Sequence, residues 1–177
     1  MNPFGPPRPK PGPFLGKFRG TVLTNIDPMF MGRLLVQVPD VSGLAPCTWA
    51  MPCVPLAGPQ TGIVALPGTG AGVWIEFEQG DSDFPVWVGC FWGSALEMPA
   101  LAQAVPPPVP GITMQTPFQN GIQISDMPGI GGVLLKTALG ATILVSELGI
   151  VIDNGKGANI SLIGPSVMIN GTALVVT

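Results

Sequence analysis

The sequence contains no histidine and no tyrosine, and only 10% of its 177 residues are charged. Without histidine, the chain has no Ser-His-Asp or Cys-His arrangement for nucleophilic catalysis and no imidazole ligand for a metal ion. Seven basic residues stand against ten acidic ones and form no basic stripe, so we expect no nucleic-acid partner. A monomer would be short of charged surface, so we expect the chain to bury surface in an assembly.

Export and membrane signals are also missing. The sequence contains no run of eighteen apolar residues, so it predicts no transmembrane helix. The proline-rich tail, residues 1–14, lacks the apolar core of a secretory signal, so we expect assembly in the cytoplasm without a signal peptide. Cys47, Cys53 and Cys90 are an odd number of thiols, and their apolar neighbours predict three small buried hydrophobic residues rather than a disulfide framework.

Glycine and proline, by contrast, are abundant. The chain has 25 glycines and 22 prolines, and 46% of its residues are hydrophobic. Such apolar segments can offset the entropy of ordering, so disorder is not expected. The combination predicts many short strands joined by tight turns, which is an all-β fold.

Residues 15–94 predict a small β-barrel. Apolar and polar residues alternate in several short runs, which is the period of a half-buried strand. Barrel closure would remove the exposed edges of such strands. The predicted strands span residues 17–24, 32–38, 45–51, 73–78 and 85–92.

The alternation also assigns the faces of these strands. Leu34, Val36 and Val38 should share one face of their strand, and the apolar residues of the fourth strand should point inward. Trp74 and Trp87 should then lie on the outer faces. We predict that these two side chains contact neighbouring subunits, since large apolar side chains on an outer face need cover.

The remainder of the chain divides into a linker and a repeat. Residues 95–111 are rich in proline and alanine and predict a stiff, extended linker. In residues 112–177 charge nearly vanishes, and glycine recurs every seven to nine residues between short alternating runs. This pattern predicts a repeat of one strand and one turn.

A repeat of about eight residues is too short to close a cylinder by itself. Three chains around one axis would cover the apolar face and the strand edges that a single chain leaves bare. The side chains predicted to line this axis are Ile152, Ile160, Leu162, Val167, Ile169, Leu174 and Val176.

Two stretches of the predicted barrel carry a specific pattern. Residues 20–39 read G-T-V…D-P…G-R-L-L-V-Q-V-P, with Trp49 after them, and residues 66–93 read L-P…G-V-W-I-E-F-E-Q-G-D-S-D-F-P-V-W-V-G-C-F-W-G. The pattern resembles the OB domain of phage baseplate assembly protein V and VgrG-type spike proteins. Residues 112–177 resemble, more loosely, the triple-stranded β-helix of the same family.

The resemblance implies a structural central spike of a contractile injection system within a phage-tail-like particle. Such a spike is a homotrimer of an OB-fold barrel and an intertwined trimeric β-helix, and it punctures the target envelope when the sheath contracts. The chain lacks the hub half of VgrG proteins, so a separate baseplate hub protein is implied, with Trp74 and Trp87 as alternative hub contacts. A PAAR-like tip protein at the C-terminal end is also implied, and no lysozyme-like domain is present.

Other interpretations remain open. An OB fold can bind single-stranded nucleic acid through stacked aromatic rings, but here basic partners are few. An envelope hydrolase is disfavoured by the missing histidine.

Glu76 and Glu78 could form a carboxylate pair, although a solvated barrel face explains them better. Residues 81–83 predict a turn rather than a calcium site, and the glycine-rich residues 68–72 lead into a strand and so do not form a phosphate-binding loop. We therefore expect no catalytic site, cofactor or metal.

Overall fold

The structure, a computed structural model, describes residues 13–105, 107–171 and 173–176. The chain divides into two compact units, Met1–Gly93 and Ser94–Thr177. Nearly all of the predicted proline-rich tail lies outside the described residues. In the described part of the chain, no helix is long and apolar enough to cross a membrane.

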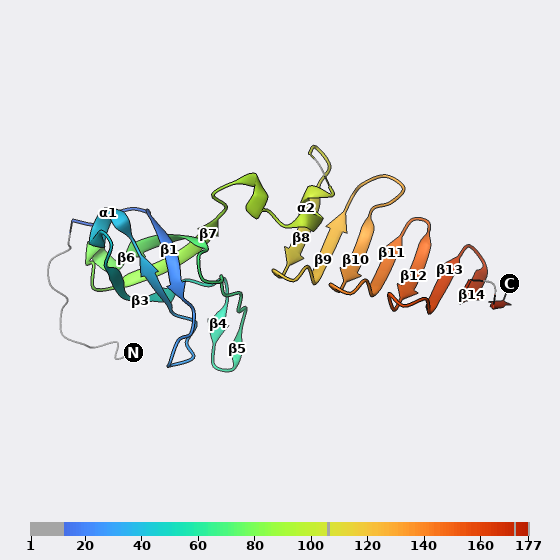
Figure 1. Cartoon of the computed structure of the whole chain (residues 1–177), viewed down its shortest axis with the longest axis horizontal. Coiled ribbons are helices and arrows are strands. Elements are labelled where there is room, and N and C mark those ends of the chain that lie inside the picture. Colours follow the sequence, from blue (N-terminus) through green and yellow to red (C-terminus); the bar gives the residue numbers. More distant parts are fainter. Residues whose placement is uncertain (1–12, 106, 172, 177) are drawn as a thin grey trace. The chain divides into compact units, whose positions relative to one another are not determined.

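The first unit is a closed five-stranded barrel, which confirms the predicted all-β, OB-type architecture (Figure 1). The neighbouring strands follow the order β1, β2, β3, β7, β6, and β3 and β7 form a parallel pair. A single helical turn, α1 (Pro39–Ser42), joins β2 to β3. The barrel strands are β1 (Phe18–Thr24), β2 (Leu34–Gln37), β3 (Pro46–Pro52), β6 (Gly72–Phe77) and β7 (Pro85–Phe91). A separate hairpin of β4 (Ala57–Gly58) and β5 (Thr61–Gly62) lies between β3 and β6.

Alternation along the strands fills the barrel as predicted. Leu34, Val36 and Val38 are fully buried, and so are Val73 and Ile75. Each lies two residues from the next along its strand, so the inward set follows the strand period. Together with the other buried side chains these residues form one continuous core.

The prediction that Trp87 lies on an outer face was wrong. Its side chain is only 5% exposed and belongs to the barrel core. It pairs across the sheet with inward-facing Ile75 and lies two residues from buried Pro85, so the alternation of β7 turns it inward. Its indole N–H donates to the carbonyl oxygen of Gly32 over 3.1 Å, so the ring is buried without an unsatisfied polar group.

The thiols are not the three buried residues that the sequence predicted. Cys53 and Cys90 are exposed, and Cys47 packs half-buried against the edge of the core. Cys53 follows the last residue of β3, and Cys90 lies next to the last residue of β7, so both positions are where the chain leaves the barrel.

The predicted linker is not extended throughout. A 3₁₀ turn (Ala95–Glu97) and a short helix, α2 (Ala100–Gln103), interrupt it. Alanine, leucine and glutamine favour a helix, and Pro99 precedes the first helical residue. Leu101 of α2 is buried against the start of the second unit's sheet.

The second unit contains one eight-stranded antiparallel sheet in which each strand pairs with the next along the chain (Figure 1). Every predicted repeat is therefore one strand and one turn of a single meander. The strands are β8 (Gly111–Gln115), β9 (Gly121–Ser125), β10 (Gly132–Lys136), β11 (Thr142–Ser146), β12 (Gly149–Asp153), β13 (Asn159–Ile163), β14 (Ser166–Ile169) and β15 (Leu174–Val176).

Candidate functional site: the apolar face of the C-terminal sheet

One face of the second unit's sheet carries only apolar side chains, and we call it the apolar face. Each strand contributes two residues in alternate positions, and the strand register aligns them in two rows. All of these side chains are at least 36% exposed in the single chain. One row consists of Ile112, Ile124, Val133, Val145, Ile150, Leu162, Val167 and Val176, and the other of Met114, Ile122, Leu135, Ile143, Ile152, Ile160, Ile169 and Leu174.

The residues predicted to line a trimer axis all lie on this face. Four of them belong to one row and three to the other, and directly paired neighbours such as Ile152 and Ile160 connect them along the sheet. That the face surrounds an axis stays a prediction. The seven residues are Ile152, Ile160, Leu162, Val167, Ile169, Leu174 and Val176.

Sequence reasoning missed the half of the apolar face that lies nearer the start of the sheet. The signal was present, because Ile122 and Ile124 alternate with polar residues just as the later pairs do. The glycine spacing is less regular there, so the repeat was harder to recognise. The missed residues are Ile112, Met114, Ile122, Ile124, Val133, Leu135, Ile143, Val145 and Ile150.

The opposite face of the sheet is mixed in character and partly covered by the chain itself. Helix α2 packs on β8 and β9 there, with the Leu101 N–H donating to the side-chain oxygen of Gln115 over 2.9 Å. The amide of Gln123, which is buried, donates to the carbonyl oxygen of Leu101. Among the described residues of the second unit, Leu101 is the only buried hydrophobic residue. This unit therefore has almost no interior of its own.

Glycines keep the strands of the meander close together at two strand starts. Gly132 and Gly149 have φ values of 133° and 146°, which side chains rarely adopt. A Cβ atom at Gly149 would overlap the carbonyl oxygen of Leu162 on β13, and one at Gly132 would overlap that of Val145 on β11. These positions require glycine for both conformation and space.

The acidic residues considered as chemical sites are spread out. Glu76 pairs with Lys17 at 2.6 Å on the exposed barrel surface. Glu78 does not lie on the same strand as Glu76, because it begins a 3₁₀ turn, Glu78–Gly80, after the end of β6. The Asp81 carboxylate accepts the Asp83 N–H over 3.0 Å, as expected of a turn. Within the described residues, no group of three or more His, Cys, Asp or Glu side chains could hold a metal ion.

Of the two tryptophans predicted to contact another subunit or a hub, only Trp74 has a partly accessible side chain. Its ring is half-buried and lies 4.9 Å, centroid to centroid, from the ring of Phe91. The Arg19 guanidinium stacks over both rings, at 5.3 Å and 4.9 Å from their centroids. Contact between Trp74 and another subunit or a hub stays a prediction.

A buried ion pair organises the loop between β1 and β2. The Asp27 carboxylate accepts hydrogen bonds from the Arg33 guanidinium, at 2.6 Å for the shortest, and from the backbone N–H groups of Met29, Met31 and Arg33. These donors hold the pKa of Asp27 far below its usual value, with Arg33 the largest cause. The D-P…G-R pattern in the sequence thus encodes a loop that is tied to the barrel by one carboxylate.

The ion pair predicts how the barrel responds to acid. Because the folded-state pKa of Asp27 is lowered, its stabilisation is fully present above the unfolded value, about 3.9, and is lost as the pH falls towards the folded value. We expect Asp27→Asn to lower the barrel melting temperature at pH 7 and to weaken its decline below about pH 4. Tryptophan fluorescence reports the transition, because all four tryptophans lie in the first unit and Trp87 donates to Gly32 in the same loop. Asp40→Asn, on exposed α1, is the control and should leave the melting temperature at pH 7 unchanged.

Comparisons with known proteins decide the family. Residues 18–92 match the type VI secretion system/phage-baseplate injector OB domain, and residues 111–175 match the phage baseplate V C-terminal trimerisation domain. The chain belongs to the phage baseplate V family of spike proteins. A comparison with curated proteins finds no match.

Membership in the phage baseplate V family assigns a structural, spike-type role and association with a baseplate. The boundaries of the two matches agree with the two units of the structure. In this baseplate spike protein, the unit that matches the trimerisation domain is the one whose apolar face is bare.

Proposed function

We propose that three copies of this chain form the central spike of a contractile injection system, docked through their barrels on a separate baseplate hub and driven into the target envelope by sheath contraction. The observation that carries the proposal is the apolar face. Its two rows of aliphatic side chains leave the second unit without an interior, and burial of such surface is the main favourable term in folding.

Three apolar faces turned towards one axis would form the interior that one chain lacks. Strands β9 to β14 already have hydrogen-bonded neighbours on both sides within the chain, so the chains would meet through side chains rather than through shared strands. Each chain would supply one wall of a three-sided prism. With eight strands about 4.8 Å apart, the wall is long and narrow, as a needle requires.

Two copies stacked face to face would also cover the apolar face, as in a β-sandwich. The match to a trimerisation domain favours three copies over two. The mixed polar character of the opposite face agrees with an exposed outer wall in either arrangement, so only the number of chains distinguishes them.

A needle that transmits force also needs short, well-bonded turns. The Asn154 side chain accepts from the N–H groups of Lys156 at 2.8 Å and Ala158 at 3.1 Å, which closes the β12–β13 turn. The Asn159 N–H donates to the Asn170 side chain over 3.0 Å, which links two neighbouring turns. Such bonds leave few mobile loops along the needle.

The remaining parts of the proposal follow from the spike role. The protein would act mechanically and not as an enzyme, would bind no nucleic acid, and would belong to a phage-tail-like particle. A PAAR-like tip protein would cover the last strands of the needle, where Leu174 and Val176 are 52% and 57% exposed.

Imaging of the chain assembled with the products of neighbouring baseplate genes tests the proposal. We expect a needle with threefold symmetry at the centre of the baseplate, on the axis of the tube. Particles assembled with Ile160→Asp should lack the needle, because the aspartates would meet on its axis. Placement of the chain on the sheath, or a peripheral position on the baseplate, would contradict the proposed function.

A further inference from the structure

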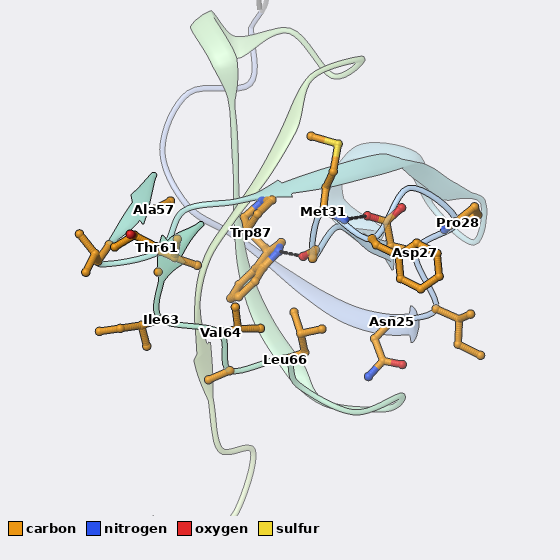
Figure 2. Close-up of a pocket in the computed structure, with 18 residues that line it drawn as sticks. Asn25, Asp27, Pro28, Met31, Ala57, Thr61, Ile63, Val64, Leu66 and Trp87 are labelled. Atoms are coloured by element: carbon orange, nitrogen blue, oxygen red, sulfur yellow. Dashed lines mark hydrogen bonds between the residues drawn. The ribbon is translucent and has the colours of Figure 1, made fainter. Parts of the chain in front are cut away.

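The barrel carries an apolar cavity of about 460 Å³ that neither the core nor the needle explains. The cavity lies between the β1–β2 loop and the segment that contains the β4–β5 hairpin (Figure 2). Figure 2 shows Trp87 between Ile63 and Val64 on one side and Asp27 on the other. Asp27 is the only charged residue in the lining, and its carboxylate is bound to Arg33.

The same loop presents an apolar protrusion. Phe30 is 95% exposed, Ile26 is 80% exposed and Met29 is 62% exposed. Phe30 has a φ of 53°, a conformation that is unfavourable for an aromatic residue and persists only where its surroundings impose it. The Asp27 carboxylate imposes it here through the N–H groups of Met29 and Met31. The chain thus holds a large apolar side chain in water at a cost in strain.

We propose that the Phe30 protrusion of one barrel occupies the apolar cavity of the next barrel, so that three barrels close into a ring. This inference rests on the proposed trimer. A ring of identical subunits uses heterologous contacts, in which each copy offers two different surfaces that fit one another. The loop with Phe30 and Ile26, which also forms one wall of its own cavity, is the protrusion, and the hairpin segment with Ile63 and Val64 on the other wall is the receiving surface.

The chemistry of both surfaces fits a second copy of this chain. The cavity is large enough for several side chains, and its lining offers a partner no free charge. The protrusion is equally free of charge along residues 28–31. In the trimer the needle also holds three barrels at high effective concentration, so a small contact area suffices for association.

Photo-crosslinking in the full chain tests this contact. With a benzophenone amino acid in place of Phe30, we expect covalent dimers and trimers on a denaturing gel, with the attachment in residues 52–66 of another copy. The same amino acid at Leu44, which is 91% exposed beyond the other end of β2, should give no such bands. Adding Val64→Asp, at a position 80% exposed in the receiving surface, should remove the crosslinked bands from the Phe30 sample.

The mass of the uncrosslinked sample separates the possible failures. A trimer without crosslinks from position 30, with crosslinks outside residues 52–66, or with crosslinks that survive Val64→Asp would overturn the barrel contact and leave the trimeric spike intact. A folded monomer would overturn both proposals. If position 30 instead crosslinks only to a co-expressed hub protein, the protrusion is a docking element for the hub and the ring of barrels is wrong.

Discussion

Ile160→Asp is expected to abolish the trimer. Ile160 lies within one row of the apolar face, paired with Ile152 on β12 and Ile169 on β14. In the proposed trimer, three aspartates would face one another on a dry axis. An uncompensated buried charge costs about 3–5 kcal/mol, so three of them should exceed what the neighbouring aliphatic contacts provide.

The matched control uses the next residue along the same strand. Ser161 points to the opposite face, and Ser161→Asp adds the same charge to β13 without placing it on the apolar face. Light scattering should give a trimer for Ser161→Asp and a monomer or an aggregate for Ile160→Asp. Trimers from both variants would show that the apolar face does not hold the chains together.

Gly149→Ala is expected to disrupt the sheet strongly, although it adds only one methyl group. The backbone at Gly149 has a φ of 146°, and the added Cβ would overlap the carbonyl oxygen of Leu162. Backbone strain of this kind costs about 1–3 kcal/mol, and relief of the overlap would move β12 away from β13. Because each copy carries the change, the trimer would lose this stability three times.

Gly157→Ala separates strain from overlap. Gly157 also has a positive φ, 99°, but no atom lies within 4 Å of the position that a Cβ would take. Thermal unfolding followed by circular dichroism should show a modest loss for Gly157→Ala and a much larger one for Gly149→Ala. Equal losses would mean that close strand approach at Gly149 contributes nothing.

Much of the barrel could be predicted because strand alternation decides which side chains are inward. Leu34, Val36 and Val38 follow this rule without exception. Trp87 follows it too, because Pro85 and Trp87 are buried while the valines at positions 86 and 88 are half-buried. All four residues are apolar, so the sequence does not show which pair faces the core. The β4–β5 hairpin and the cavity beside it were not predicted, because strands of two residues are too short to show an alternation of apolar and polar residues.

The apolar face could be predicted in its second half, where glycines recur and Ile160, Leu162, Val167 and Ile169 alternate with other residues. That all strands join one meander within the chain follows from turns too short for any other connection. The helix of α2 was missed because prolines on both sides suggested an extended segment. The repeat alone does not fix the number of chains, because any partner that covers the apolar face satisfies the same physics. Three chains were one solution to the bare face, and the family resemblance favoured that number.

The mass of the purified full-length protein in solution tests the central claim most directly, that the needle has no interior until copies of the chain share one. Native mass spectrometry should find a single species of three chains, each of 18.2 kDa, at all concentrations at which the protein stays folded. A folded, monodisperse single chain that does not associate would contradict the account.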